Sequence, residues 1–154
     1  MHRFARVAIT TALVALTTAA HGATRGTPAE ARAMLQKAID HFKSAGRRQA
    51  LADFTAGRAP FRDRDLYVVC VAADRKILAS GGFPQYVGMS ADMMRDARGN
   101  PIGKALWEAA AKDPAGSIQY PMINPMTHQT ELKTTFYAKV ADDVLCCVGA
   151  YGTP

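Results

Sequence analysis

The residues best suited to chemistry lie in the last third of this 154-residue chain, where Lys133, Tyr120 and Asn124 occur within a short stretch. A lysine ammonium beside a tyrosine hydroxyl and a side-chain amide can hold a carboxylate through charge-assisted hydrogen bonds. Apolar neighbours would limit the length of the carboxylate's tail, and the candidates for this part are Met122, Phe83 and Tyr86. These residue types predict a site for a small organic acid.

The strands that carry these residues alternate between two faces. Along 131–140 the alternation places Lys133 and Thr135 on one face, and along 118–122 it places Tyr120 and Met122 together. Each residue also has a structural interpretation: Lys133 as a solvated lysine, Tyr120 as a core tyrosine, and Asn124 with the following proline as a turn. Both interpretations stay open at the level of sequence.

Motifs for catalysis or for metal binding are missing from the sequence. It contains no Gly-x-Ser-x-Gly, Walker or Gly-x-Gly-x-x-Gly pattern, and no Cys-x-x-Cys pair. After residue 23 the only histidines are His41 and His128, and neither stands at a zinc-ligand spacing. We therefore expect a protein that is not an enzyme and that uses no metal and no cofactor.

The three cysteines are Cys70, Cys146 and Cys147, and both segments that carry them are predicted strands. If those strands are neighbours, Cys70 can form a disulfide with either Cys146 or Cys147 in an oxidising compartment. The alternative is that all three are small buried apolar residues. The sequence does not decide between these arrangements.

Residues 1–23 have the pattern of an export signal. A basic start with Arg3 and Arg6 precedes an apolar stretch over 7–20, and small residues follow it. That stretch is shorter than the roughly 20 residues that span a bilayer, although an uncleaved N-terminal anchor is the alternative. We expect a periplasmic or secreted protein with a cleaved signal peptide.

The remainder has the composition of a single soluble domain over residues 27–154. The chain is 49% hydrophobic and 21% charged, and loss of Arg3 and Arg6 lowers its net charge from +6 to +4. No basic stripe with interleaved aromatic residues occurs, so nucleic-acid binding is not expected.

Periodicity predicts an α+β fold. A capping box at Thr27 predicts a long helix that ends at Gly46, and shorter helices follow at 47–56 and 102–112. Five strands are predicted, at 66–73, 77–80, 117–122, 131–141 and 144–151. We expect the long N-terminal helix to pack beside a five-stranded antiparallel sheet, with short helices on the other side.

An ordered set of landmarks resembles a known family. The set comprises Asp65-Leu66-Tyr67-Val68-Val69, Gly88, Asp96-x-x-Gly99, Tyr120, Asn124-Pro125, Lys133 before Thr135, and Val148-Gly149-Ala150-Tyr151. Over residues 29–151 it resembles the second type of single Cache domain, a PAS-like extracytoplasmic sensor module. The chain departs from the family at Ser117 and Met122, where tryptophan is common, and at Phe136, where an aromatic hydroxyl is common.

This resemblance implies a ligand pocket between the sheet and segment 83–100, as in relatives that sense acetate, propionate or pyruvate. It implies ligand contacts from the residues named above and from Tyr67, which is otherwise a core aromatic residue. Since no second spanning segment or signalling domain follows, we expect a separate membrane sensor or transporter as partner. The alternative is an interaction module with a vestigial pocket that forms a homodimer through its N-terminal helix.

Overall fold

The computed structural model describes residues 25–152, which form three α-helices, two short 3₁₀ helices and six strands. The predicted signal segment, residues 1–23, lies outside the described residues, as do residues 153 and 154. Among the helices of the described range, none is long and apolar enough to cross a membrane.

The helices follow the apolar periodicity of the sequence. Helix α1 (Pro28–Ala45) begins with a complete capping box between Thr27 and Glu30 and buries one face. Helix α2 (Arg47–Ala56) follows directly after Gly46, and α3 (Ile102–Lys112) lies later in the chain. The segment 81–101 contains the 3₁₀ helices η1 (Pro84–Tyr86) and η2 (Ala91–Met93). The predicted helices are confirmed.

The strands form an antiparallel sheet in the order β1-β2-β6-β5-β4. Strand β3 also pairs with β2, along the edge of β2 that does not face β6. Their bounds are β1 Arg62–Asp63, β2 Leu66–Ala72, β3 Ile77–Ser80, β4 Ala115–Ile123, β5 Thr130–Ala141 and β6 Val144–Tyr151. Five of the six were predicted. The sixth, β1, has only two residues, too few to show any alternation.

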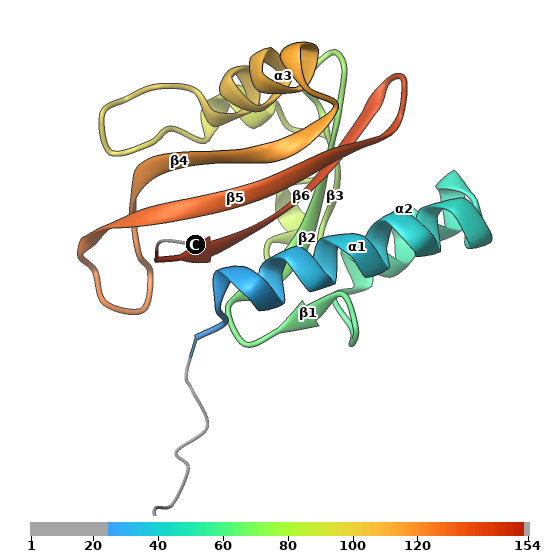
Figure 1. Cartoon of the computed structure of the whole chain (residues 1–154), viewed down its shortest axis with the longest axis horizontal. Coiled ribbons are helices and arrows are strands. Elements are labelled where there is room, and N and C mark those ends of the chain that lie inside the picture. Colours follow the sequence, from blue (N-terminus) through green and yellow to red (C-terminus); the bar gives the residue numbers. More distant parts are fainter. Residues whose placement is uncertain (1–24, 153–154) are drawn as a thin grey trace, which may run out of the picture.

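Helices cover both faces of this sheet (Figure 1). Helices α1 and α2 pack on one face over a core that includes Phe54, Val68 and Val148. Helix α3 packs on the opposite face, where its Leu106 joins Tyr137 and Leu145 of the sheet in a second apolar cluster. The α+β arrangement with a long helix beside the sheet and short helices on the other side is therefore confirmed.

The two adjacent cysteines of β6 lie on opposite faces of the sheet. Cys70 of β2 is directly opposite Cys146 in the antiparallel register, and the structure joins this pair in a disulfide. Cys147 is a buried free thiol on the α3 face. Because successive residues of a strand point to opposite sides, only one of the two can face Cys70.

Candidate functional site

Three strands bring a lysine and two tyrosines into one row on the α3 face of the sheet. Tyr120 of β4 is paired with Lys133 of β5, and Lys133 is paired with Tyr151 of β6. Directly opposite residues of neighbouring strands point to the same face, so the three side chains are neighbours. Two residues further along β5, and on the same face, Thr135 is opposite Gly149 of β6. This row defines the candidate site.

Lys133 is the charged centre of the site. Its Nζ lies 4.7 Å from the ring centroid of Tyr151 and 5.9 Å from that of Tyr67. The side chain is half-buried, and burial lowers the pKa of the ammonium from its usual value, while attraction to the Asp65 carboxylate and to the ionised form of Cys147 acts in the opposite direction. Among residues 25–152, no carboxylate forms an ion pair with Lys133. The ammonium is thus held among aromatic rings without a counter-ion from the described chain.

Tyr120 and Thr135 form a hydroxyl pair beside this ammonium. Their oxygens are 2.7 Å apart, and either can be the donor. Burial raises the pKa of Tyr120, so its phenol stays protonated and keeps a donor near neutral pH. Met122, further along β4, packs against the same apolar cluster as Tyr120.

Gly149 leaves the space that Lys133 and Thr135 fill. A Cβ at this position would lie 2.5 Å from Lys133 Cε and 2.8 Å from Thr135 Oγ1. Both distances are shorter than van der Waals contact, so any other residue would displace these side chains. The absence of a side chain at Gly149 therefore lets Lys133 and Thr135 adopt these positions.

Aromatic rings from two segments continue the site toward η1. The rings of Tyr67 and Phe83 meet edge to face with centroids 5.6 Å apart, and Phe83 stacks on Tyr86 at 5.4 Å. Phe83 is at the edge of the surface, with 36% of its area exposed. The structure therefore connects Lys133 through Tyr67 to both aromatic residues predicted from segment 83–100.

Asn124 is the first residue of the β4–β5 loop and follows Ile123, whose carbonyl accepts a hydrogen bond from the Tyr151 hydroxyl at 3.0 Å. Its amide nitrogen donates to Glu131 at 3.1 Å, and its amide oxygen accepts from the backbone N–H of Met126 at 2.9 Å. The side chain is buried, and these contacts with β5 and with the loop occupy both of its polar atoms. The turn interpretation of Asn124 agrees with this geometry.

Sequence reasoning did not select Tyr151, Gly149 or Cys147 as site residues, yet all three lie on this face. Alternation along β6 places them together, so the signal was present in the segment 144–151. Burial raises the pKa of the Cys147 thiol to about 12, with the Lys133 charge acting in the opposite direction. Cys147 therefore contributes a neutral, apolar wall.

The chemistry of these groups favours reversible binding of an anion. A cation flanked by aromatic rings and by hydroxyl donors suits a carboxylate with a short apolar tail. Within the described range, no group of three or more histidine, cysteine, aspartate or glutamate side chains is placed to hold a metal ion.

A sheet covered by a long helix on one face, with a cation and aromatic rings on the other, is the architecture of a PAS-like sensor domain. The sequence matches the family described as single Cache domain 2 over residues 5–151, and the chain belongs to that family. Members of this family are extracytoplasmic sensor domains, not catalytic ones. No curated protein matches the chain in sequence.

Solved structures similar to this chain include chemotaxis and chemosensory domains. One is a methyl-accepting chemotaxis protein from Vibrio parahaemolyticus RIMD 2210633, with a TM-score of 0.60 and 16% identity over 80% of this chain and 86% of that one. A periplasmic sensor domain of a chemotaxis protein gives 0.63 and 18%, over 81% and 94%. A Cache chemosensory domain described for carboxylic acid recognition gives 0.57 and 14%, over 80% and 86%. At such identities these matches establish the fold.

Proposed function

We propose that this chain is an exported Cache domain that captures a short organic acid on the α3 face of its sheet. The observation that carries the proposal is the Lys133 ammonium, half-buried among tyrosine rings with no acidic partner in the described part of the chain. A partly desolvated charge without a counter-ion is unfavourable, and a bound carboxylate would compensate for it.

In this proposal the residues of the site have separate roles in binding the ligand. Lys133 neutralises the carboxylate, and the hydroxyl pair of Tyr120 and Thr135 supplies a hydrogen-bond donor to it. Phe83 and Tyr86 limit the tail, because their stacked rings stand at the end of the aromatic chain that begins at Tyr67. These groups bind and release a ligand without forming or breaking a covalent bond, so the proposed activity is not enzymatic.

The comparisons support the ligand class and the location. One structural neighbour is described as recognising carboxylic acids, and another as a periplasmic sensor domain. The export signal predicted over residues 1–23 agrees with a periplasmic or secreted protein. We further propose that a separate membrane sensor or transporter reads the bound state, so that the chain serves signal transduction or uptake.

Thermal unfolding of the purified protein tests the proposal. The panel is acetate, propionate and pyruvate, with acetamide and propionamide as uncharged controls of matched size. A ligand at about 100 times its Kd adds roughly 2.7 kcal/mol of stability, which raises the Tm by several degrees. The proposal requires a rise with at least one acid and none with its amide. A Tm unchanged by every acid, or raised equally by acids and amides, would overturn it.

A further inference from the structure

The outer edge of β4 is a sheet edge with free hydrogen-bonding positions. β4 is the last strand in the order of the sheet and pairs only with β5 among the described elements. The Lys139 N–H donates to the Pro114 carbonyl, so residues 114 and 139 form a hydrogen-bonded pair of the ladder. In an antiparallel pair such residues alternate with residues whose backbone groups point away from the partner strand. By that alternation the N–H and C=O groups of Ser117 and Gln119 point away from β5.

Both ends of this edge are closed by the chain itself. At one end the Asp113 carboxylate accepts the Ala115 N–H at 3.2 Å, and at the other the Ala97 N–H donates to the Pro121 carbonyl at 2.8 Å. No described residue bonds the backbone groups of Ser117 and Gln119 between these points. The open edge thus accepts about five residues of an added strand, or roughly 17 Å of extended chain.

Hollows flank this edge on both faces of the sheet. On the α1 side, a hollow of about 330 Å³ reaches the edge at Ser117. A second hollow of about 500 Å³ adjoins the first and lies between α1 and the ring of Phe136, without a lining residue from β4. On the α3 side, a hollow of about 450 Å³ is lined by Gln119, Lys104 and Glu108, with other residues of β4, α3 and the loop before it. Alternate side chains of a strand added to β4 would point toward these two sides in turn.

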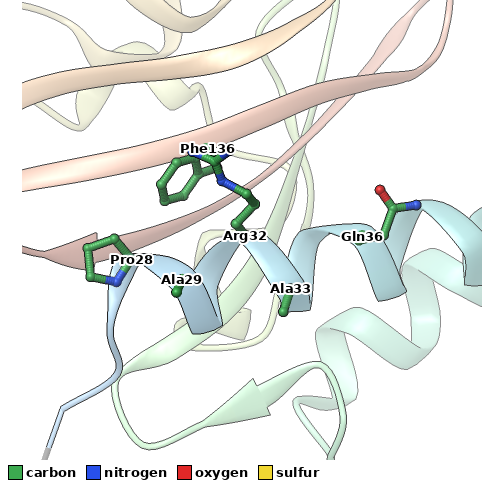
Figure 2. A pocket seen from close by; sticks show the side chains of 6 residues that line it. All are labelled: Pro28, Ala29, Arg32, Ala33, Gln36 and Phe136. Carbon is green, nitrogen blue, oxygen red and sulfur yellow. The ribbon is translucent and has the colours of Figure 1, made fainter. Parts of the chain in front are cut away.

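The charge of the α1-side hollows is positive. Arg32 lines both of them, and Figure 2 shows its side chain reaching from α1 to Phe136, with the guanidinium 4.8 Å from the ring centroid. No acidic residue lines either hollow. Arg32 forms no ion pair with any side chain of residues 25–152. An acidic side chain of an added strand would supply the missing partner.

We infer that the β4 edge is a docking site for a short extended segment of another protein, with an acidic side chain that meets Arg32. Backbone hydrogen bonds to Ser117 and Gln119 would provide affinity, and the alternate hollows would provide sequence preference. A second copy of this chain fits less well, because a symmetric pairing of β4 edges would add a second Arg32 and no acid. This surface includes the edge of β4 and hollows on both of its sides, and Tyr120 lines the α3-side hollow. The inference rests on backbone groups and on Arg32, so it does not depend on the carboxylate proposal.

A fluorescent peptide measures the docking directly. The probe is acetyl-Thr-Val-Glu-Val-Thr with a C-terminal dye, and its control has lysine in place of glutamate. Fluorescence anisotropy with the full-length protein should show saturable binding of the glutamate peptide and binding at least tenfold weaker for the lysine peptide. Hydrogen exchange should slow at Ser117 and Gln119 when the glutamate peptide is bound.

Two variants separate the backbone contact from the charge. Ser117→Pro removes an outward N–H that β5 does not use, and Ser117→Ala keeps it, so only the proline variant should lose binding by tenfold or more. Arg32→Gln should abolish the preference for glutamate over lysine while unfolding stays cooperative. Equal binding by wild type and Ser117→Pro, no binding of either peptide, or a dimer that Ser117→Pro dissociates would overturn the inference.

Discussion

The Lys133 ammonium lies 4.7 Å from the ring centroid of Tyr151, its direct partner across the β5–β6 ladder. A tyrosine ring attracts a cation, which offsets part of the cost of holding the charge away from water. The ring cannot, however, satisfy the three N–H donors of the ammonium as hydrogen-bond acceptors do. The contact therefore holds Lys133 in place while leaving its donors available to a ligand.

Replacement of Lys133 by methionine should raise the stability of the free protein and abolish carboxylate binding. Lys133→Met keeps most of the side-chain volume and removes a partly desolvated charge, so the free protein should gain about 1 kcal/mol of stability. The same variant should lose the rise in Tm produced by carboxylates. Differential scanning fluorimetry with and without acetate, propionate and pyruvate measures both effects.

Lys139 of the same strand gives a matched control. It is exposed, lies on the same face, and places its Nζ 5.9 Å from the ring centroid of Trp107. Lys139→Met should leave carboxylate binding unchanged. If both methionine variants lose binding equally, the anion is attracted by the general positive charge of the face and Lys133 has no specific role.

Gly149→Ala should damage the site through crowding. Its Cβ would lie 2.5 Å from Lys133 Cε, so the variant should lose about 2 kcal/mol of stability and weaken carboxylate binding. Combining it with Lys133→Ala removes that close contact, and the double variant should be more stable than the sum of the two changes implies. Urea unfolding of the four proteins measures the coupling. Strict additivity would show that the two residues do not touch in solution.

The fold was largely predictable, because its helices and strands have clear local periodicity. The long α1 combines a capping box with apolar spacings of three and four. In β5, side chains alternate in direction between the two faces of the sheet, although residues 134–138 are buried on both. The same alternation correctly grouped Lys133 with Thr135. The two-residue β1 carries no such signal, and segment 83–93 has no regular period, so the stack of Phe83 on Tyr86 could not be derived from sequence pattern.

The neighbours of Lys133 were harder to predict than its own orientation. Tyr151 meets Lys133 only because β6 lies between β2 and β5, and strand order is not encoded in the alternation of any single strand. Asn124 follows β4 directly in sequence, but its amide is used in contacts with Glu131 of β5 and with the Met126 backbone, which the sequence pattern does not reveal.

The Cys147 thiol should be unreactive in the folded protein. With a pKa of about 12, only about one thiol in ten thousand is ionised at pH 8, and the side chain is also buried. Iodoacetamide at pH 8 should leave Cys147 unmodified in buffer and alkylate it fully in guanidinium chloride, as read by mass spectrometry. Labelling in buffer as fast as in denaturant would contradict this burial.

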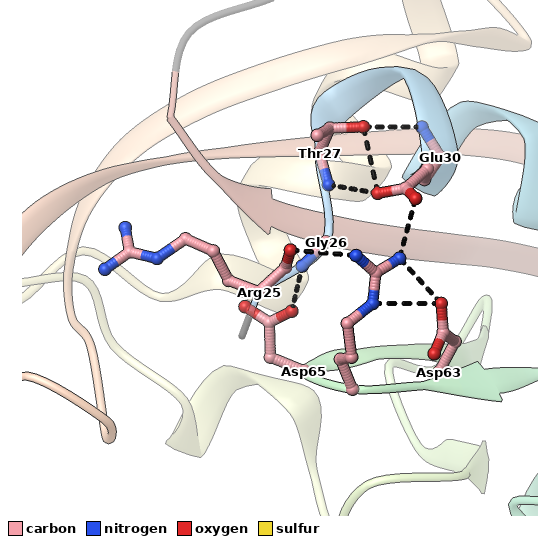
Figure 3. A network of polar contacts seen from close by, with 7 residues as sticks. Arg25, Gly26, Thr27, Glu30, Asp63 and Asp65 are labelled. Atoms are coloured by element: carbon pink, nitrogen blue, oxygen red, sulfur yellow. Dashed lines mark hydrogen bonds and ion pairs between the residues drawn. The ribbon is translucent and has the colours of Figure 1, made fainter. Parts of the chain in front are cut away.

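A polar network ties the start of α1 to the turn before β2 (Figure 3). The Thr27 backbone N–H donates to Glu30, and Arg64 donates to Glu30 at 2.7 Å and to the Arg25 carbonyl at 3.0 Å. The Gly26 N–H donates to Asp65 at 2.6 Å. Asp65 stands two residues before Tyr67, so this network holds the strand that carries one wall of the site.

Glu30 should make this network sensitive to acid. The hydrogen bond from Arg64, followed by those from Thr27, lowers the pKa of the Glu30 carboxyl from 4.5 to about 2. Because the folded-state pKa is the lower one, the contribution of Glu30 to stability is complete above pH 4.5 and is lost as the pH falls toward 2. Glu30→Gln should therefore destabilise the protein at pH 7 and have less effect at pH 2.5. The control is Glu108→Gln, at an exposed position of α3, which should change stability little at either pH. Thermal unfolding at both pH values measures this, and an equal loss at the two would show that the carboxylate charge contributes nothing.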